Sequence, residues 1–276
     1  MALKPALVFL IVALVSQASI AASEHEMFVG AQKEQICAAS TLDIVGKFLG
    51  IDGFHLEQTG RGPRIIAAAA CKKNPAAPRI TIAAVAFNDG KDDAKATVVA
   101  LVDESRRRVI ASIRGEIGED AAMRVESGSL WIDTAPYTLA PGIRAFGVDL
   151  TSGYIPHCGD GGSGADRTLY VQEGKNLRPI FGLTMSYWHF VKGGSPRCMS
   201  SAQARDDTVI QNTDVSISVA NTVTSGYRDI VVTATSSEEG RSKTQKKPFL
   251  YKGRYDGREF PIQGLTDSFD KWNRWP

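Results

Sequence analysis

The first periodic run of hydrophobic residues in the chain predicts an amphipathic helix from Thr41 to Leu49. Leu42, Val45 and Leu49 recur at helical spacing, whereas Asp43 falls on the opposite side. Side chains at this spacing share one face of an α-helix. The segment therefore carries one broad apolar stripe.

Both ends of this segment carry helix-boundary signals. Ser40 followed by Asp43 resembles a capping box, and Gly50 is suited to close the last turn. Gly46 lies inside the segment and costs about 1 kcal/mol relative to alanine. We expect one helix that begins near Ser40 and ends at Gly50.

Beyond this helix the hydrophobic pattern changes to that of β-strands. Residues 97–102 and 109–114 flank the charged turn Asp103-Glu104-Ser105, which is typical of a hairpin. At the end of the chain, residues 249–255 and 258–262 are joined by Asp256-Gly257, a strong hairpin signal. Further strands are predicted at 80–87, 130–133, 143–150, 168–171, 179–185, 215–219 and 230–235.

So many strands with little helix between them predict a mainly β fold of antiparallel sheets with one N-terminal amphipathic helix. Region 23–140 combines helix and sheet, and region 141–276 is all β, with a boundary near Ala140-Pro141-Gly142. The class becomes α+β if the first region is a separate domain. One continuous domain is equally allowed.

The all-β region contains a faint repeat. Thr151-Ser152-Gly153-Tyr154 recurs as Thr224-Ser225-Gly226-Tyr227. Either a duplicated sheet unit or two similar turns explains this pair.

Residues 1–22 have the pattern of a secretory signal peptide. Lys4 precedes an unbroken apolar run over residues 6–15, and small residues follow up to Ala22. That run is short of the roughly 20 residues that span a bilayer. We expect cleavage after Ala21 or Ala22, no membrane span in the mature chain, and a periplasmic or secreted protein.

The charge balance disfavours a nucleic-acid partner. The chain has 32 Lys and Arg against 30 Asp and Glu, a formal net charge of +2. Nucleic-acid binding needs a clustered basic face. Arg106-Arg107-Arg108 is such a cluster on a small scale, but charges that solvate an exposed turn explain it as well.

The four cysteines indicate disulfide bonds. Cys37, Cys71, Cys158 and Cys198 all follow the signal segment, and an even count in an oxidising compartment favours two bridges. Proximity favours Cys37 with Cys71 and Cys158 with Cys198, while the sequence alone leaves three pairings open. No Cys-x-x-C pair supports a thiol oxidoreductase or a zinc ribbon.

The glycine-rich stretch from His157 to Asp166 is the clearest candidate for chemistry. Asp160 and Asp166 offer carboxylates that suit calcium, but the EF-hand spacing fails and a turn explains the same string. Ser163 with His157 or His189 would suit a hydrolase site between residues 157 and 189, although no known nucleophile motif is present. We expect no cofactor.

Aromatic residues gather late in the chain. Tyr187 and Trp188 lie together, and Trp272 and Trp275 lie near the C-terminus. Such side chains stack on sugars or anchor a protein partner, or else they fill a sheet core. We predict these four as binding residues.

Three stretches resemble uncharacterised exported proteins of Gram-negative bacteria. They cover residues 101–116, 139–147 and 168–179. The resemblance implies export and carries no known activity. The sequence therefore favours an exported, disulfide-stabilised protein that binds a protein partner, an inhibitor target or an envelope glycan. The alternatives are a secreted hydrolase and a calcium-stabilised structural module.

Overall fold

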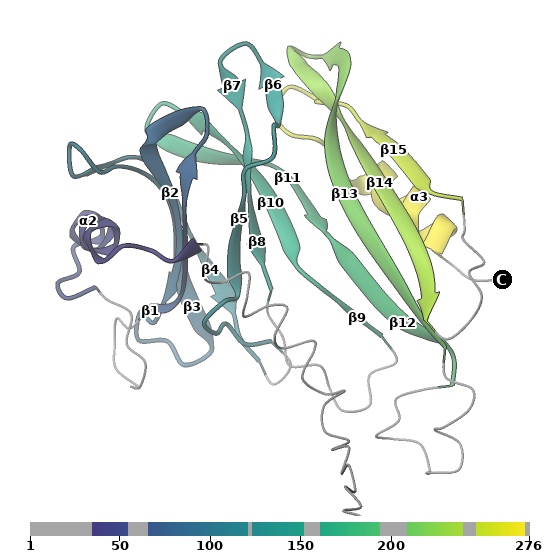
Figure 1. Ribbon diagram of the computed structural model, residues 1–276, viewed down its shortest axis with the longest axis horizontal. Coiled ribbons are helices and arrows are strands. Elements are labelled where there is room, and N and C mark those ends of the chain that lie inside the picture. Colours follow the sequence, from purple (N-terminus) through teal and green to yellow (C-terminus); the bar gives the residue numbers. More distant parts are fainter. Residues whose placement is uncertain are drawn as a thin grey trace, which may run out of the picture.

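The computed structural model describes residues 35–54, 66–120, 123–151, 161–193, 209–239 and 247–273. These residues form a mainly β protein with two large sheets, one small sheet and two helices (Figure 1). The elements are α2 (Ala39–Leu49), β1 (Ile66–Asn74), β2 (Ala77–Phe87), β3 (Ala94–Asp103), β4 (Arg108–Gly118), β5 (Leu130–Asp133), β6 (Thr138–Ala140), β7 (Ile143–Arg144), β8 (Phe146–Leu150), β9 (Gly161–Ser163), β10 (Asp166–Glu173), β11 (Asn176–Thr184), β12 (Ser186–Lys192), β13 (Val209–Thr224), β14 (Tyr227–Glu239), β15 (Phe249–Gly253) and α3 (Gln263–Asn273).

The first large sheet has eight strands in the order β1-β2-β3-β4-β11-β10-β8-β5. Its first four strands form an antiparallel meander, as the turn signals predict. The sheets are antiparallel, as expected, except at one place, where β11 meets β4 in parallel through Asn176 and Ser112. No hairpin links β4 to β11, so chain connectivity does not force them to run in opposite directions.

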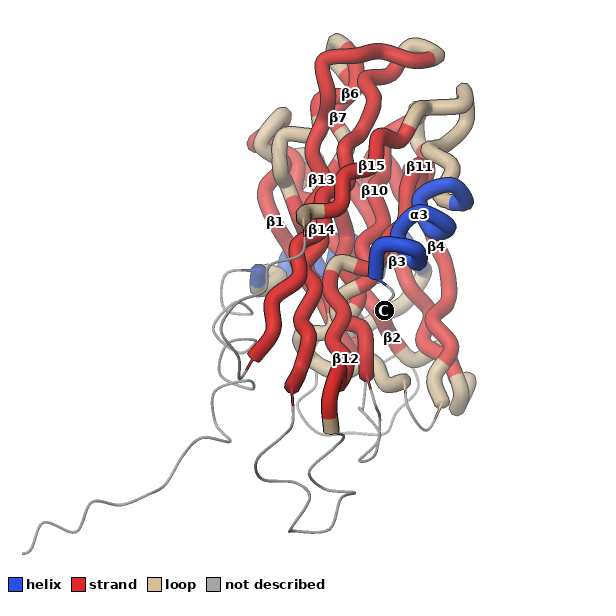
Figure 2. Tube along the Cα trace, turned by 90° about the vertical axis from the view of Figure 1, so that its right-hand side faces the viewer, coloured by secondary structure: helices blue, strands red, loops and turns tan. Residues whose placement is uncertain are grey.

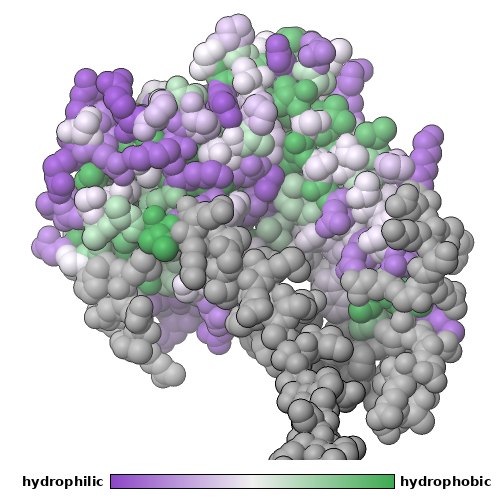
Figure 3. All heavy atoms as spheres, viewed as in Figure 1, coloured by the Kyte–Doolittle hydropathy of each residue, from purple (hydrophilic) through white to green (hydrophobic). Residues whose placement is uncertain are grey.

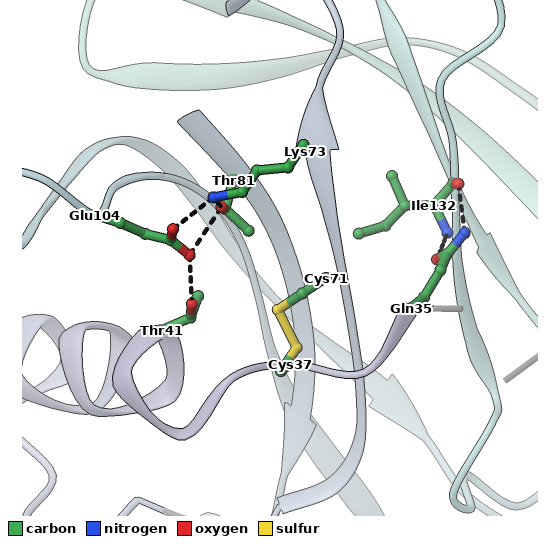
Figure 4. Close-up of a disulfide and its surroundings, with 8 residues drawn as sticks. All are labelled: Gln35, Cys37, Thr41, Cys71, Lys73, Thr81, Glu104 and Ile132. Carbon is green, nitrogen blue, oxygen red and sulfur yellow. Dashed lines mark hydrogen bonds and ion pairs between the residues drawn. A yellow bond between two sulfur atoms is a disulfide. The ribbon is translucent and has the colours of Figure 1, made fainter. Parts of the chain in front are cut away.

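This sheet curls until its two edges meet. β5 contacts both β1 and β2. At this seam the side-chain amide of Gln35 donates to the Ile132 carbonyl at 2.9 Å and accepts from the Ile132 amide at 2.7 Å (Figure 4). Lys72 also donates to the Ile132 carbonyl, at 3.4 Å. Gln35 thus pairs with the edge of β5 as a neighbouring strand would.

The curled sheet is buried on both faces. One cluster lies inside the curl and includes Ile82, Leu101 and Ile132. A second lies outside under α2 and includes Val45 and Val85. Burial on both sides explains why β2 and β3 consist of nearly continuous apolar residues.

Helix α2 confirms the predicted helix but not its predicted cap. The N-cap is Ala38, which makes no side-chain capping bond. Asp43 pairs instead with Lys47 and Arg107. Gly50 ends the helix in the left-handed conformation, with φ 74°. Gly46 allows close packing, because a Cβ atom there would lie 2.4 Å from Cβ of Phe54.

One of the two expected disulfides is present. Cys37 and Cys71 form a bridge that ties the segment before α2 to β1 (Figure 4). Both cysteines are buried. Cys158 and Cys198 lie outside the described residues, so their pairing stays a prediction.

The second large sheet has five strands in the order β15-β14-β13-β12-β9. β12 directly continues β11, and β9 leads into β10, so two long strands pass from one large sheet into the other (Figure 1). Ile230 and Val232 of β14 pack in one cluster with Leu169 of β10 and Ile180 of β11. Figure 2 shows β13–β15 on one side and α3 on the other.

The expected C-terminal hairpin forms only in part. β15 and the turn at Asp256-Gly257 are present, but residues 258–262 are not a strand. Asp256 instead accepts hydrogen bonds from the amides of Arg258 and Glu259, and Phe260 turns into the core. α3 follows and is a second helix that the sequence prediction lacked.

Three further expectations relate to the whole chain. The curled sheet draws strands from both sides of residue 140, and the division into regions 23–140 and 141–276 stays a prediction. Of the repeated tetrapeptides, residues 152–154 lie outside the described residues, while Ser225 and Gly226 form the β13–β14 turn. Within the described ranges, the helices are too short or too polar to cross a membrane.

Candidate functional site

The five-stranded sheet has one buried and one exposed face. Along β13, Val215 and Ile217 point into the core, whereas Asp214, Ser216 and Ser218 are exposed. Successive side chains of a strand point to opposite faces, so the strict alternation separates the two sets. α3 lies behind the sheet in Figure 1, and the exposed face is turned toward the viewer.

We call this exposed side the outer face. Register places on it residues from four adjacent strands. They are Ser186, Trp188 and Phe190 of β12, Ile210, Asn212, Asp214, Ser216 and Ser218 of β13, Val231, Thr233, Thr235 and Ser237 of β14, and Leu250 and Lys252 of β15.

An aromatic corner occupies one end of the outer face. Trp188 and Phe190 meet edge to face, with ring centroids 5.6 Å apart and an interplanar angle of 89°. Ile210 lies opposite Phe190 on β13. All three side chains are half-buried, so part of each stays accessible to a ligand.

Trp188 packs directly against the backbone of β9. Gly162 pairs with Trp188, and a Cβ atom at position 162 would lie 2.6 Å from Nε1 of the indole. Only glycine permits this approach. Residues 161–163 form an edge strand that pairs with β12. The interpretation of this part of the glycine-rich stretch as a turn is therefore wrong.

The middle of the outer face is polar and nearly uncharged. Its cross-strand pairs include Asn212 with Ser237, Asp214 with Thr235, and Ser216 with Thr233. Hydroxyl and carboxamide groups both donate and accept hydrogen bonds. Figure 3 shows mostly white, pale or green residues over this part of the molecule, while strongly hydrophilic residues gather over the curled sheet at the left. Such a surface suits the hydroxyl groups of a ligand.

The structure separates the predicted binding residues. Tyr187 points away from the outer face and packs on Phe269 of α3, with the two ring centroids 5.3 Å apart. Trp272 packs on the same Phe269 and donates from Nε1 to the Lys247 carbonyl at 2.9 Å. Burial raises the pKa of Tyr187. Only Trp188 lies on the outer face, and Trp275 lies outside the described residues.

Those residues of the calcium and hydrolase alternatives that the structure describes lie near the β9 edge. Asp166 is exposed and accepts a hydrogen bond from Thr184 at 2.5 Å, while Asp160 lies outside the described residues. Within the described part of the chain, no group of three His, Cys, Asp or Glu residues is arranged to hold a metal ion. Ser163 pairs with Tyr187, and His189 pairs with Gly161. His157 lies outside the described residues.

Two charged clusters have structural partners. Arg106 pairs with Asp103, and Arg107 pairs with Asp43 at 2.6 Å. Arg106 and Arg107 thus lie in the β3–β4 turn and pair with carboxylates of the protein itself, and Arg108 begins β4.

Sequence reasoning missed the second cluster. Arg167 binds Asp149 through two hydrogen bonds of 2.6 and 2.7 Å and Asp133 at 2.5 Å, with Tyr137 donating to Asp133. Burial and the hydrogen bond to Asp133 raise the pKa of Tyr137. The partners come from separate segments, so no local pattern announces them.

Sequence reasoning also missed most of the outer face. The alternation of polar and apolar residues over 214–219 was the available signal, because it marks a strand with one solvent-facing side. No protein-family model, curated protein or solved structure matches this chain.

Proposed function

We propose that the protein is exported and binds an envelope glycan through the outer face of its five-stranded sheet. The observation that carries this proposal is the position of Trp188, half-exposed against Gly162 and bordered by hydroxyl and carboxamide side chains. A sugar ring presents both a C–H face and hydroxyl groups. The indole matches the first, and Asn212 and Ser186 match the second.

The nearly uncharged middle of the face favours a glycan over a protein as the ligand. Ser216, Thr233 and Thr235 present hydroxyl groups in regular rows. Rows on one strand lie about 7 Å apart, and neighbouring strands lie about 4.8 Å apart. A flat, regular array of this kind matches the repeating hydroxyl groups of a polysaccharide chain.

Two observations support a location in the cell envelope. Residues 1–22 have the signal-peptide pattern, and the Cys37–Cys71 bridge suits an oxidising compartment. Mass spectrometry of the protein purified from its native envelope should find a chain that begins at residue 22 or 23. An intact Met1 on a cytosolic protein would contradict export.

The glycan function is tested by retention on insoluble polysaccharides, with purified peptidoglycan and chitin as probes. We expect the full mature chain to be retained and Trp188→Ala to weaken binding about tenfold, the effect of losing an aromatic contact of about 1.5 kcal/mol. The matched control is Trp131→Ala, which removes another half-buried tryptophan from the curled sheet.

The two variants separate the site from general surface effects. Equal loss of binding in both variants would contradict a site at Trp188. Failure of the wild-type chain to bind either polymer, together with recovery of one stoichiometric protein partner after crosslinking, would favour a protein ligand instead.

A further inference from the structure

The corner of the outer face farthest from Trp188 is positively charged. Lys252 lies on β15 opposite Val231, and Arg254 follows two residues later. Both side chains are exposed. Both lie near the beginning of β14, because Val231 pairs with Lys252 and Ile230 pairs with Gly253, the residue before Arg254.

Asp229 is a buried anchor for this corner. Its side chain is only 2% exposed, and Thr222 donates to its Oδ2 at 2.5 Å, while Oδ1 has no hydrogen-bond partner. Lys252 donates to the same Thr222 hydroxyl at 3.2 Å. Burial alone would raise the pKa of Asp229, but the threonine hydroxyls and the two cations hold it below its ordinary value. One buried anion therefore lies beside two exposed cations, and the cluster keeps a net positive charge.

These two cations differ from the arginines of the β3–β4 tip. Arg106 and Arg107 form ion pairs with carboxylates of the protein itself. The ion pairs among the described residues include neither Lys252 nor Arg254. An external anion can approach Lys252 and Arg254 because both side chains are exposed, and their positive charges attract that anion.

We propose that the ligand is an extended acidic polysaccharide that spans the outer face. This proposal rests on the proposed glycan function. A sugar ring stacks on Trp188, and an anionic group farther along the chain, a carboxylate, sulfate or phosphate, binds Lys252 and Arg254. The two corners lie three pair positions apart along the strands and three strands apart across the sheet, which gives a separation of about 25 Å. A single sugar cannot contact both, so the ligand must be an oligomer.

The test compares two polymers with one backbone: polygalacturonate, which is acidic, and its methyl ester, which is neutral. The full mature chain is used. The double variant Lys252→Gln/Arg254→Gln removes the basic corner. The matched control, Lys175→Gln/Arg108→Gln, removes two exposed cations elsewhere and gives the same net charge. Circular dichroism confirms that each variant is folded.

We expect wild-type protein to bind the acid at least tenfold more tightly than the ester at low salt. The preference should vanish in the basic-corner variant, persist in the control and shrink in about 0.5 M salt. Equal, Trp188-dependent binding of both polymers would overturn the acidic specificity and leave the glycan function intact. An equal loss of preference in both double variants would also overturn it. Binding of neither polymer, nor of peptidoglycan or chitin, would count against both proposals.

Discussion

Glu104 joins three elements through one carboxylate. Oε1 accepts hydrogen bonds from Thr41 of α2 at 2.7 Å and Thr81 of β2 at 2.9 Å, and Oε2 accepts from Lys73 of β1 at 2.5 Å (Figure 4). The hydrogen bond from Lys73 lowers the pKa of Glu104, burial opposes it, and the two threonines lower it further. The sequence reveals only a charged hairpin tip here, because the partners lie 23 to 63 residues away.

The depressed pKa of Glu104 fixes the direction of a pH effect. Since the folded state favours the carboxylate, the stabilisation is present above the ordinary pKa and is lost as the pH falls through the folded value. We expect Glu104→Gln to lower the free energy of unfolding by about 1–2 kcal/mol near neutral pH. The loss should shrink as the pH is lowered from about 6 to about 3 in urea titrations. Glu126→Gln, at an exposed side chain, is the control, and a pH-independent loss would contradict this account.

Elements differ in how far local sequence determined them. α2 and the β1–β4 meander follow from helical spacing, apolar runs and turn residues, all of which act within a few residues. The parallel pairing of β4 with β11 and the junction of the two sheets depend on contacts between distant segments. Trp188 was predicted for binding and lies on the outer face, whereas Tyr187 packs against α3 and Trp272 is part of α3, so their role in binding stays a prediction. β12 lacks the polar–apolar alternation of β13, so its two faces are told apart only when its neighbours are known.

Helix α3 was missed although its pattern was present. Leu265, Phe269 and Trp272 recur at helical spacing in an otherwise polar segment. They cover the inner side of the five-stranded sheet, where Phe269 meets Phe249 and Tyr187. The apolar side chains are few, so the helix depends on the sheet for its stability.

We expect Leu265→Ala to lower the free energy of unfolding by about 2–4 kcal/mol, because this leucine is 1% exposed. Ile262→Ala, at a 47% exposed side chain just before the helix, should cost under about 0.5 kcal/mol. Denaturant unfolding measures both. Since α3 packs opposite the outer face, glycan retention at temperatures where Leu265→Ala stays folded should be unchanged.

At the scale of the whole molecule, the segment before α2 closes the curled sheet. Gln35 fills the seam at Ile132, and the Cys37–Cys71 bridge two residues later fixes that segment to β1. A sheet edge with unpaired backbone groups invites pairing with another chain, and the amide of Gln35 satisfies part of the β5 edge. The disulfide therefore holds in place the same segment that closes the curled sheet.

Because the disulfide holds Gln35 in the seam, its removal should have a local effect at β5 in addition to its effect on the free energy of unfolding. Replacing Cys37 and Cys71 by serine should lower the free energy of unfolding by about 2–4 kcal/mol. Amide exchange should also accelerate locally at β5 around Ile132, because Gln35 is no longer held in the seam. Gln35→Leu should reproduce the local acceleration at β5 with the disulfide intact, while amides of β13 and β14 in the other sheet keep their protection. If the serine variant instead exchanged faster across both sheets equally, the bridge would act on the fold as a whole and not through the seam.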